Sequence, residues 1–137
     1  MMTGKVLVDT NVVSYTMRGK REAEAYERHL SNRLLLISFI TVGELYYGAE
    51  KGRWGQSQMN RLDEHLRNFL VVPYDYRIAR LYGSARAGRQ RSGRPISSSD
   101  AWIAACALRH EIPLVTHNAR DFEGIPGLAL ITEVLPR

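Results

Sequence analysis

The sequence predicts an α/β fold with a mainly parallel central sheet. Three observations lead to this prediction: short aliphatic and β-branched runs of strand length, segments of helical composition between them, and the absence of repeats or proline- and serine-rich stretches. Strands that alternate with helices are typical of parallel sheets, because a crossover between parallel strands needs a dozen or more residues. A chain of 137 residues can bury a core of its own, so residues 1–137 are expected to form a single domain.

Five runs are expected as strands, and each is bounded by polar residues, glycine or proline. They are residues 5–9, 34–40, 69–73, 113–116 and, as a short last strand, 128–131. Between them we expect helices over residues 10–17, 22–32, 41–51, 57–68, 75–85 and 101–110, with a turn or short helix over residues 117–122.

Hydroxyl, amide and carboxyl side chains mark where several of these helices are expected to begin. Thr10 or Asn11 is predicted to cap the first helix, and Asp75 the fifth. Thr41 is predicted to cap the third helix, with Glu44 three residues later in the spacing of a capping box. Glu44 is therefore expected in the first turn of that helix.

The last third of the chain contains a basic stretch followed by a very apolar one. Residues 86–94 are basic and contain glycine, which predicts a loop. Residues 101–110 are apolar on nearly all helical faces, which indicates a helix buried on both sides. Cys106, the only cysteine, lies in this helix, so we expect a buried thiol and no intrachain disulfide.

The composition and the termini limit where the protein acts and what it binds. The formal net charge is +5 and the pI is about 9.7, which favours polyanions such as nucleic acid, although many basic proteins bind none. The apolar run near the N-terminus is too short for a signal peptide, and no run approaches the roughly 20 residues that span a bilayer. We therefore expect a cytoplasmic protein that does not bind membranes.

Four acidic residues occur at similar places relative to the predicted strands. Asp9 ends the first strand, Glu44 follows the second, Asp100 begins the buried helix before the fourth strand, and Asp121 follows the fourth. The carboxyl ends of parallel strands meet at one edge of the sheet, where ligands bind in α/β proteins. Each acid alone has an ordinary alternative as a cap, a helix-dipole partner or an exposed loop residue. Their shared placement predicts one acidic site.

A cluster of four carboxylates needs a cation, because the negative charges otherwise repel one another or become protonated. Oxygen ligands without neighbouring cysteine or paired histidine suit Mg²⁺ or Mn²⁺ better than Zn²⁺. These ions activate water and stabilise the charge on a phosphate under in-line attack. The residues alone therefore point to phosphodiester chemistry.

Four segments resemble the motifs of PIN domains, in the right order and across nearly the whole chain. They are V-L-V-D-T-N with Asp9, I-T-V-G-E-L with Glu44, S-S-S-D-A-W-I-A-A with Asp100 and L-V-T-H-N-A-R-D-F with Asp121. D-T-N alone is a weak signal, whereas the four motifs together are specific. Within PIN domains, the compact size and these variants are most similar to VapC toxins.

This resemblance implies a PIN-like (Rossmannoid) three-layer α/β/α sandwich and a metal-dependent endoribonuclease, the toxin of a VapBC toxin–antitoxin module. It also implies a homodimer and a VapB-like antitoxin that inserts into the toxin and blocks the acidic site. Operator DNA would be bound only through the antitoxin. The implied cofactor is Mg²⁺, with Mn²⁺ as an alternative, and the implied reaction is hydrolysis of RNA by metal-activated water, leaving 5′-phosphate and 3′-hydroxyl ends.

The resemblance also assigns roles to the acids. Asp9, Glu44 and Asp100 would be the core metal-binding and catalytic acids, and Asp121 the fourth, acting directly or through water.

Two polar residues would support these acids, again by resemblance. Asn11 would steady Asp9, and Thr116 would hold a water or orient the site. In the fourth motif, Asn118 competes with Asp121 for a polar contact.

Two groups of residues are candidates for RNA contact. One is the basic stretch before Asp100, and its members are Arg86, Arg89, Arg91 and Arg94. The other is Lys51, Arg53 and Trp54, in which the tryptophan is available to stack on a base. A solvated loop and a tryptophan packed in the protein or against a partner are the respective alternatives.

Two rival functions remain to be weighed. A phosphatase of the haloacid-dehalogenase type also places an aspartate after its first strand, but uses D-x-D, where this chain has Asn11. A non-toxin or non-catalytic PIN-type RNA-binding module would be expected to lack one of the core acids, and all are present. The RNA target is not specified by any motif.

Overall fold

A computed structural model describes residues 4–133 and contains a five-stranded sheet in which every pair of neighbouring strands is parallel. The strand order is β3-β2-β1-β4-β5, so the first strand of the chain is central. The strands are β1 (Lys5–Val8), β2 (Leu34–Ser38), β3 (Leu70–Val72), β4 (Leu114–Val115) and β5 (Leu130–Ile131). The predicted α/β fold with a mainly parallel sheet is confirmed.

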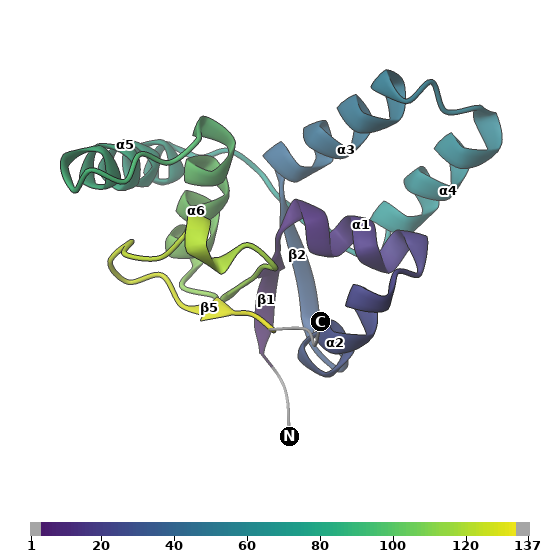
Figure 1. Ribbon diagram of the computed structural model, residues 1–137, viewed down its shortest axis with the longest axis horizontal. Helices are drawn as coiled ribbons and strands as arrows, with labels where there is room; N and C mark the ends of the chain where they lie inside the picture. Colours follow the sequence, from purple (N-terminus) through teal and green to yellow (C-terminus); the bar gives the residue numbers. More distant parts are fainter. Residues whose placement is uncertain (1–3, 134–137) are drawn as a thin grey trace.

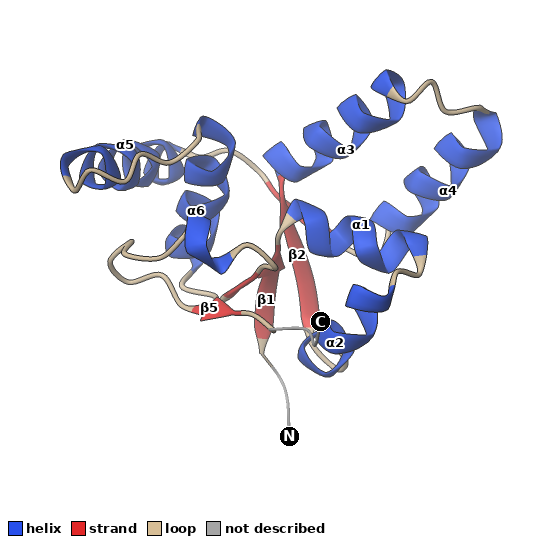
Figure 2. Ribbon diagram, in the orientation of Figure 1, coloured by secondary structure: helices blue, strands red, loops and turns tan. Residues whose placement is uncertain are grey.

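Within residues 4–133, six α-helices and one short 3₁₀ helix connect the strands (Figures 1 and 2). They are α1 (Thr10–Arg18), α2 (Arg21–Leu30), α3 (Phe39–Lys51), α4 (Gln56–Leu66), α5 (Tyr76–Arg91), α6 (Ser98–His110) and η1 (Ala119–Asp121). Figure 1 shows α5 and α6 on one side of the sheet and α1, α2 and α4 on the other, which is the expected three-layer arrangement. The pair α3 and α4 extends past the end of β2 at which α3 begins.

Alternation along β1 separates two buried cores. Leu7 belongs to the core under α5 and α6, whereas Val6 and Val8 belong to the core under α1 and α2. Successive strand residues point to opposite faces of a sheet, so a strand covered on both sides must be apolar throughout. The continuous apolar run that suggested a buried strand therefore reflects helices on both faces.

The start of α3 differs from the prediction. The helix begins at Phe39, and the hydroxyl of Ser38 caps it by accepting a 3.1 Å hydrogen bond from the N–H of Ile40. Thr41 is buried inside the helix, and its hydroxyl contacts the hydroxyl of Thr10 at 2.9 Å instead. The predicted capping box at Thr41 is therefore wrong, and Glu44 lies in the second helical turn rather than the first.

The predicted loop at residues 86–94 is wrong for residues 86–91, because α5 continues to Arg91, and right for residues 92–94. The helix is held there by Arg89, whose side chain is only 6% exposed. Its guanidinium donates hydrogen bonds of 2.7 and 2.8 Å to the carbonyls of Arg94 and Asp121. These hydrogen bonds thus outweigh the helix stability lost at Gly88, about 1 kcal/mol relative to alanine.

Two further expectations concern α6 and the membrane. Cys106 is buried in α6 without a disulfide partner, as expected. Across residues 4–133, every helix is too short or too polar to cross a bilayer.

Candidate active site

Asp9 lines a pocket at the carboxyl end of β1. It is the residue between β1 and α1, and its Oδ1 accepts a 2.8 Å hydrogen bond from the N–H of Thr10. The hydroxyl of Thr116, which follows β4, donates a 2.7 Å hydrogen bond to Oδ2. Because β1 and β4 are parallel neighbours, the fold brings these two residues to the same edge of the sheet.

Burial makes the charge on Asp9 costly. The side chain is 5% exposed, and loss of solvent raises its pKa from 3.8 to about 6. The hydrogen bonds from Thr116 and Thr10 oppose this rise, whereas the charges of Asp100 and Glu44 add to it. The site therefore brings negative charges together, and among residues 4–133 no cationic side chain lowers the pKa of Asp9.

Glu44 reaches the same space from α3 through a chain of hydroxyl groups. The Thr10 hydroxyl donates a 2.7 Å hydrogen bond to Oε1 of Glu44 and lies 2.9 Å from the Thr41 hydroxyl. Thr10 thus contacts one acid with its main chain and another with its side chain. The predicted cap of the first helix at Thr10 or Asn11 is wrong, because Asp9 caps α1. The role of Thr10 beside the acids was missed, although Thr10 directly follows a strand-ending aspartate.

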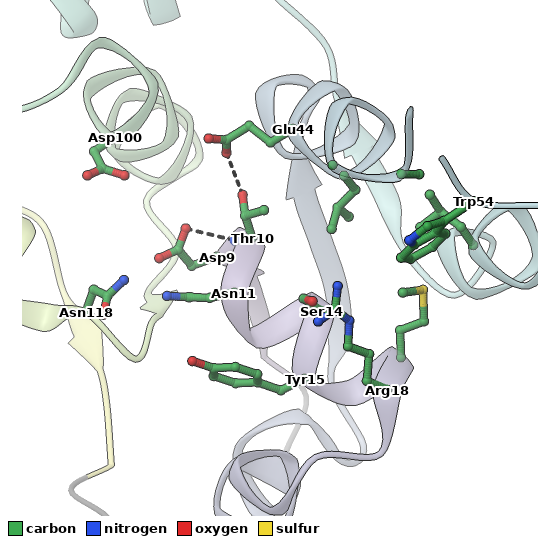
Figure 3. Close-up of a pocket in the computed structure, with 15 residues that line it drawn as sticks. Asp9, Thr10, Asn11, Ser14, Tyr15, Arg18, Glu44, Trp54, Asp100 and Asn118 are labelled. Atoms are coloured by element: carbon green, nitrogen blue, oxygen red, sulfur yellow. Dashed lines mark hydrogen bonds between the residues drawn. The ribbon is translucent and has the colours of Figure 1, made fainter. Parts of the chain in front are cut away.

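Asp100 faces these two acids from the first turn of α6 (Figure 3). Ser97 caps the helix by accepting a 3.1 Å hydrogen bond from the Asp100 N–H. Burial raises the pKa of Asp100, and the neighbouring charges of Asp121 and Glu44 raise it further. The structure therefore brings three of the four predicted acids together around one pocket.

Asp121 lies at the margin of this group. It is exposed at the end of η1, close enough for its charge to act on Asp100. Its carbonyl, rather than its carboxylate, is the acceptor for Arg89. Asn118 lines the pocket directly. Of these two residues of the fourth motif, Asn118 therefore lines the pocket and Asp121 lies outside its lining.

Asn11 points into the pocket without a hydrogen-bond partner. Its Oδ1 atom is buried, and within residues 4–133 it accepts no hydrogen bond from protein atoms. Figure 3 shows its side chain directed toward the space between Asp9 and Asn118. The contacts that hold Asp9 come from Thr10 and Thr116 instead. The end of the Asn11 side chain that faces this space in Figure 3 is the amide nitrogen, so the buried oxygen is not presented to a cation in the pocket.

These groups fit a hard divalent cation. The available donors are carboxylate and amide oxygens, which suit Mg²⁺ or Mn²⁺. A cation there would reverse the electrostatic penalty that raises the pKa of Asp9. Among residues 4–133, no three acid, histidine or cysteine side chains are arranged closely enough to hold a metal ion as they stand. Asp9, Asp100 and Glu44 would supply the charged ligands by turning their carboxylates toward the cation.

The predicted arginine group is divided by the fold. Arg89 is buried and engaged with main-chain carbonyls, so its guanidinium is not available to a phosphate. Arg86, Arg91 and Arg94 are exposed. Arg86 donates a 2.6 Å hydrogen bond to the Tyr82 hydroxyl, and Arg94 lies 3.7 Å from a carboxylate oxygen of Glu123.

The pocket has a volume of about 370 Å³ and is lined by residues of α1, α3 and α6 (Figure 3). Its acidic end contains Asp9, Glu44 and Asp100, and its other end contains Arg18 and Trp54. Lys51 and Arg53, the other two residues of the second RNA-contact candidate, are exposed and lie respectively three residues and one residue before Trp54 in the chain.

The chain is similar in sequence to known proteins of one family. The family model for the PIN domain matches residues 6–128. Ribonuclease VapC2 of Haemophilus influenzae is 34% identical over 94% of this chain and 96% of its own length. The tRNA(fMet)-specific endonuclease VapC of Shigella flexneri is 32% identical over 90% of this chain and 94% of its own.

Solved structures give the same picture. A chain of the VapBC2 complex of Rickettsia felis, bound to a DNA fragment from its promoter, superposes with a TM-score of 0.84 at 26% identity, covering 95% of this chain and 99% of that one. A chain of the DNA-bound VapBC complex of Salmonella typhimurium superposes with a TM-score of 0.77 at 30% identity, covering 93% and 97%.

Proposed function

The chain belongs to the PIN-domain family and, within it, to the VapC ribonucleases, and from this premise we propose that it is the endoribonuclease toxin of a VapBC toxin–antitoxin module. We further propose that it hydrolyses RNA with the help of Mg²⁺ or Mn²⁺ held by Asp9, Glu44 and Asp100. The observation that carries the metal-dependent activity is the convergence of these three carboxylates, from β1, α3 and α6, on one pocket. The intact acid set favours an enzyme over a non-catalytic RNA-binding module.

The residues of the chain divide the work of the reaction. A bound divalent cation would supply a more acidic water and neutralise charge on the scissile phosphate. Thr10 and Thr116 fix the two oxygens of Asp9, and Thr10 also orients Glu44. Pre-set ligand oxygens lower the cost of reorganisation when substrate and cation bind. Asp121, exposed beside Asp100, is proposed to act through water rather than as a direct ligand.

The cationic surface supports the binding of RNA. Carboxylates repel a phosphate backbone, so a nuclease with an acidic centre needs arginine or lysine around it. Arg86, Arg91 and Arg94 are exposed on α5 and the segment that leads to α6. We propose that they contact RNA phosphates, and that buried Arg89 only holds this segment in place.

The partners proposed for the chain follow from its relatives. Structural neighbours include toxin–antitoxin complexes bound to promoter or other DNA. We propose a VapB-like antitoxin that covers the acidic pocket, contact with operator DNA through that antitoxin alone, and a homodimer of the toxin. The expected place of action is the cytoplasm, where RNA is the substrate.

The first experiment compares the wild-type chain with Asp9→Asn and with Glu24→Gln, a change at an exposed acid of α2. Total cellular RNA is incubated with each protein in Mg²⁺, in Mn²⁺ and in chelator. Wild type and Glu24→Gln should give discrete fragments with 5′-phosphate ends in metal only, and Asp9→Asn should give none. Fragments with 2′,3′-cyclic phosphate ends would contradict the proposed hydrolysis.

Metal binding is measured separately by thermal melting. A ligand that binds only the folded state stabilises it by about 2.7 kcal/mol at a concentration 100 times its dissociation constant. Mg²⁺ or Mn²⁺ should therefore raise the melting temperature of wild type and Glu24→Gln, and raise that of Asp9→Asn and Asp100→Asn much less. An equal shift in all four proteins would place the metal elsewhere.

A further inference from the structure

The active-site pocket continues beyond the acids to a tryptophan. Trp54 lies in the turn between α3 and α4 and lines the same pocket as Asp9 and Asp100 (Figure 3). A second pocket of about 280 Å³ shares Arg18 and Trp54 with the first and extends over Arg61 on α4. The two pockets therefore adjoin at Arg18 and Trp54, and the second lies over the middle of α4.

The indole of Trp54 is held in place by the turn that carries it. The N–H of Trp54 donates a 3.0 Å hydrogen bond to the carbonyl of Ala49. A Cβ atom added at Gly52 would lie 3.1 Å from Nε1 and 3.2 Å from Cδ1 of the Trp54 ring. Gly52 has an ordinary helical conformation, with a φ of −79°, so its backbone does not need glycine. The same Cβ would lie 3.2 Å from the carbonyl oxygen of Gly48, so the indole and the preceding helical turn together crowd this position.

Two arginines surround this ring without carboxylate partners. The guanidinium of Arg18 lies over the Trp54 ring, 6.0 Å from the centroid. That separation exceeds a direct contact of about 3.5–4 Å, and Arg18 is exposed, so a small rotation of its side chain admits a planar group against the ring. Arg61 is also exposed, and along residues 4–133 neither arginine forms an ion pair.

We propose that Trp54, Arg18 and Arg61 form a nucleotide subsite, in which the indole stacks on an unpaired base of the RNA and the two arginines bind the adjoining phosphates. This subsite rests on the proposed ribonuclease function and adds where the strand runs as it leaves the acids. Base stacking on an aromatic ring tolerates every base, and arginine binds phosphate through a planar fork. The subsite therefore takes single-stranded RNA of any sequence.

The charges favour RNA over a protein segment as the occupant. The pocket that holds Asp9 and Asp100 extends to Trp54 and Arg18, so a strand bound at the acids would meet an aromatic ring beside positive charge. The alternation of a planar apolar group with single negative charges is the chemistry of a polynucleotide. An antitoxin segment in the same place is the competing occupant, and the test separates the two.

The test measures binding of two 12-nucleotide strands by the full-length chain in chelator, where cleavage is prevented. One strand is oligoadenosine, and the other has the same ribose-phosphate backbone without bases. Trp54→Ala should weaken binding of oligoadenosine by at least about fivefold and leave the baseless strand unchanged, since stacking alone is lost. Trp54→Phe should recover most of the affinity. Trp102→Phe, at the other tryptophan, which stacks on Tyr82, is the matched control and should change neither strand.

A second measurement avoids any effect of Trp54→Ala on folding. In Trp102→Phe, Trp54 is the remaining tryptophan, and oligoadenosine should quench its fluorescence while the baseless strand does not. Arg18→Gln and Arg61→Gln should weaken both strands alike and reduce the salt dependence of binding.

Three results would overturn the subsite. They are equal weakening of both strands by Trp54→Ala, no quenching by the base-bearing strand, and loss of antitoxin affinity in Trp54→Ala with RNA binding intact. If wild type binds neither strand, the subsite is also rejected, and cleavage of total RNA in metal still decides the proposed function independently.

Discussion

The hydroxyl of Thr116 donates a 2.7 Å hydrogen bond to Oδ2 of Asp9, a residue 107 positions earlier in the chain. The same hydroxyl accepts a 3.0 Å hydrogen bond from the N–H of Asn118. Thr116 is fully buried, so water cannot replace either contact without rearrangement. One side chain therefore links the deepest carboxylate of the site to the segment that carries the fourth acid.

Thr116→Val should destabilise the protein by about 1–3 kcal/mol at pH 7, because a buried charged oxygen and a buried N–H both lose a partner. It should also raise the pKa of Asp9 further, since the Thr116 hydrogen bond lowers it. Urea denaturation and the pH profile of RNA cleavage measure the two effects. Thr116→Ser keeps the hydroxyl and should behave like wild type; equal behaviour of the valine and serine variants would mean that the hydroxyl has no such role.

The stability of the metal-free protein should fall as the pH rises from about 4 to 6. The folded pKa of Asp9 is about 6 and its ordinary value is 3.8, so the folded chain holds this proton more tightly than the unfolded chain. The contribution is fully present below pH 3.8 and is lost as the pH rises through 6.

Asp9→Asn should therefore be more stable than wild type above pH 6 in chelator, by no more than about 3 kcal/mol, and similar to it near pH 4. Asparagine also keeps the ability to cap α1. Melting curves of both proteins and of Glu24→Gln across this pH range measure the difference. Parallel curves for wild type and Asp9→Asn would contradict the burial of a charged Asp9.

Arg89→Gln should mainly lower the stability of the protein, whereas Arg91→Gln should mainly weaken RNA binding. Arg89→Gln removes donors from two carbonyls in a buried place and should cost at least about 2 kcal/mol of stability. Arg91→Gln should change stability by less than about 0.5 kcal/mol and weaken RNA binding, with the salt slope reduced by about 1. Denaturation and binding titrations at several salt concentrations separate the two. The reverse pattern would make Arg89 the phosphate ligand.

The strands and the acids that follow them were predictable because local pattern determines them. An apolar run covered on both faces and ended by a polar residue can be recognised from a few neighbouring residues, as with Val8 and Asp9. Sheet order was not predictable in this way, since β1 pairs with strands from positions near 34 and near 114. Nothing local in β1 specifies those two neighbours.

The errors at Ser38 and Arg89 have the same physical origin. Ser38 and Thr41 both have side chains that cap helices well, and Ser38 is the one that caps α3. The hydroxyl of Thr41 contacts the hydroxyl of Thr10, which belongs to a distant part of the chain. The helix through Arg89 is stabilised by carbonyls beyond its own end, including that of Asp121. Propensity alone favours a cap at one residue and a loop at the other, and tertiary contacts reverse both preferences.

The central position of β1 has a consequence for protein synthesis. Asp9 is made 107 residues before its partner Thr116, and β1 is made before its neighbour strand β4. A chain still attached to the ribosome cannot complete the surroundings of Asp9 until Thr116 has left the exit tunnel. The order of translation therefore postpones assembly of the carboxylate site, although Asp9 and Glu44 leave the tunnel much earlier.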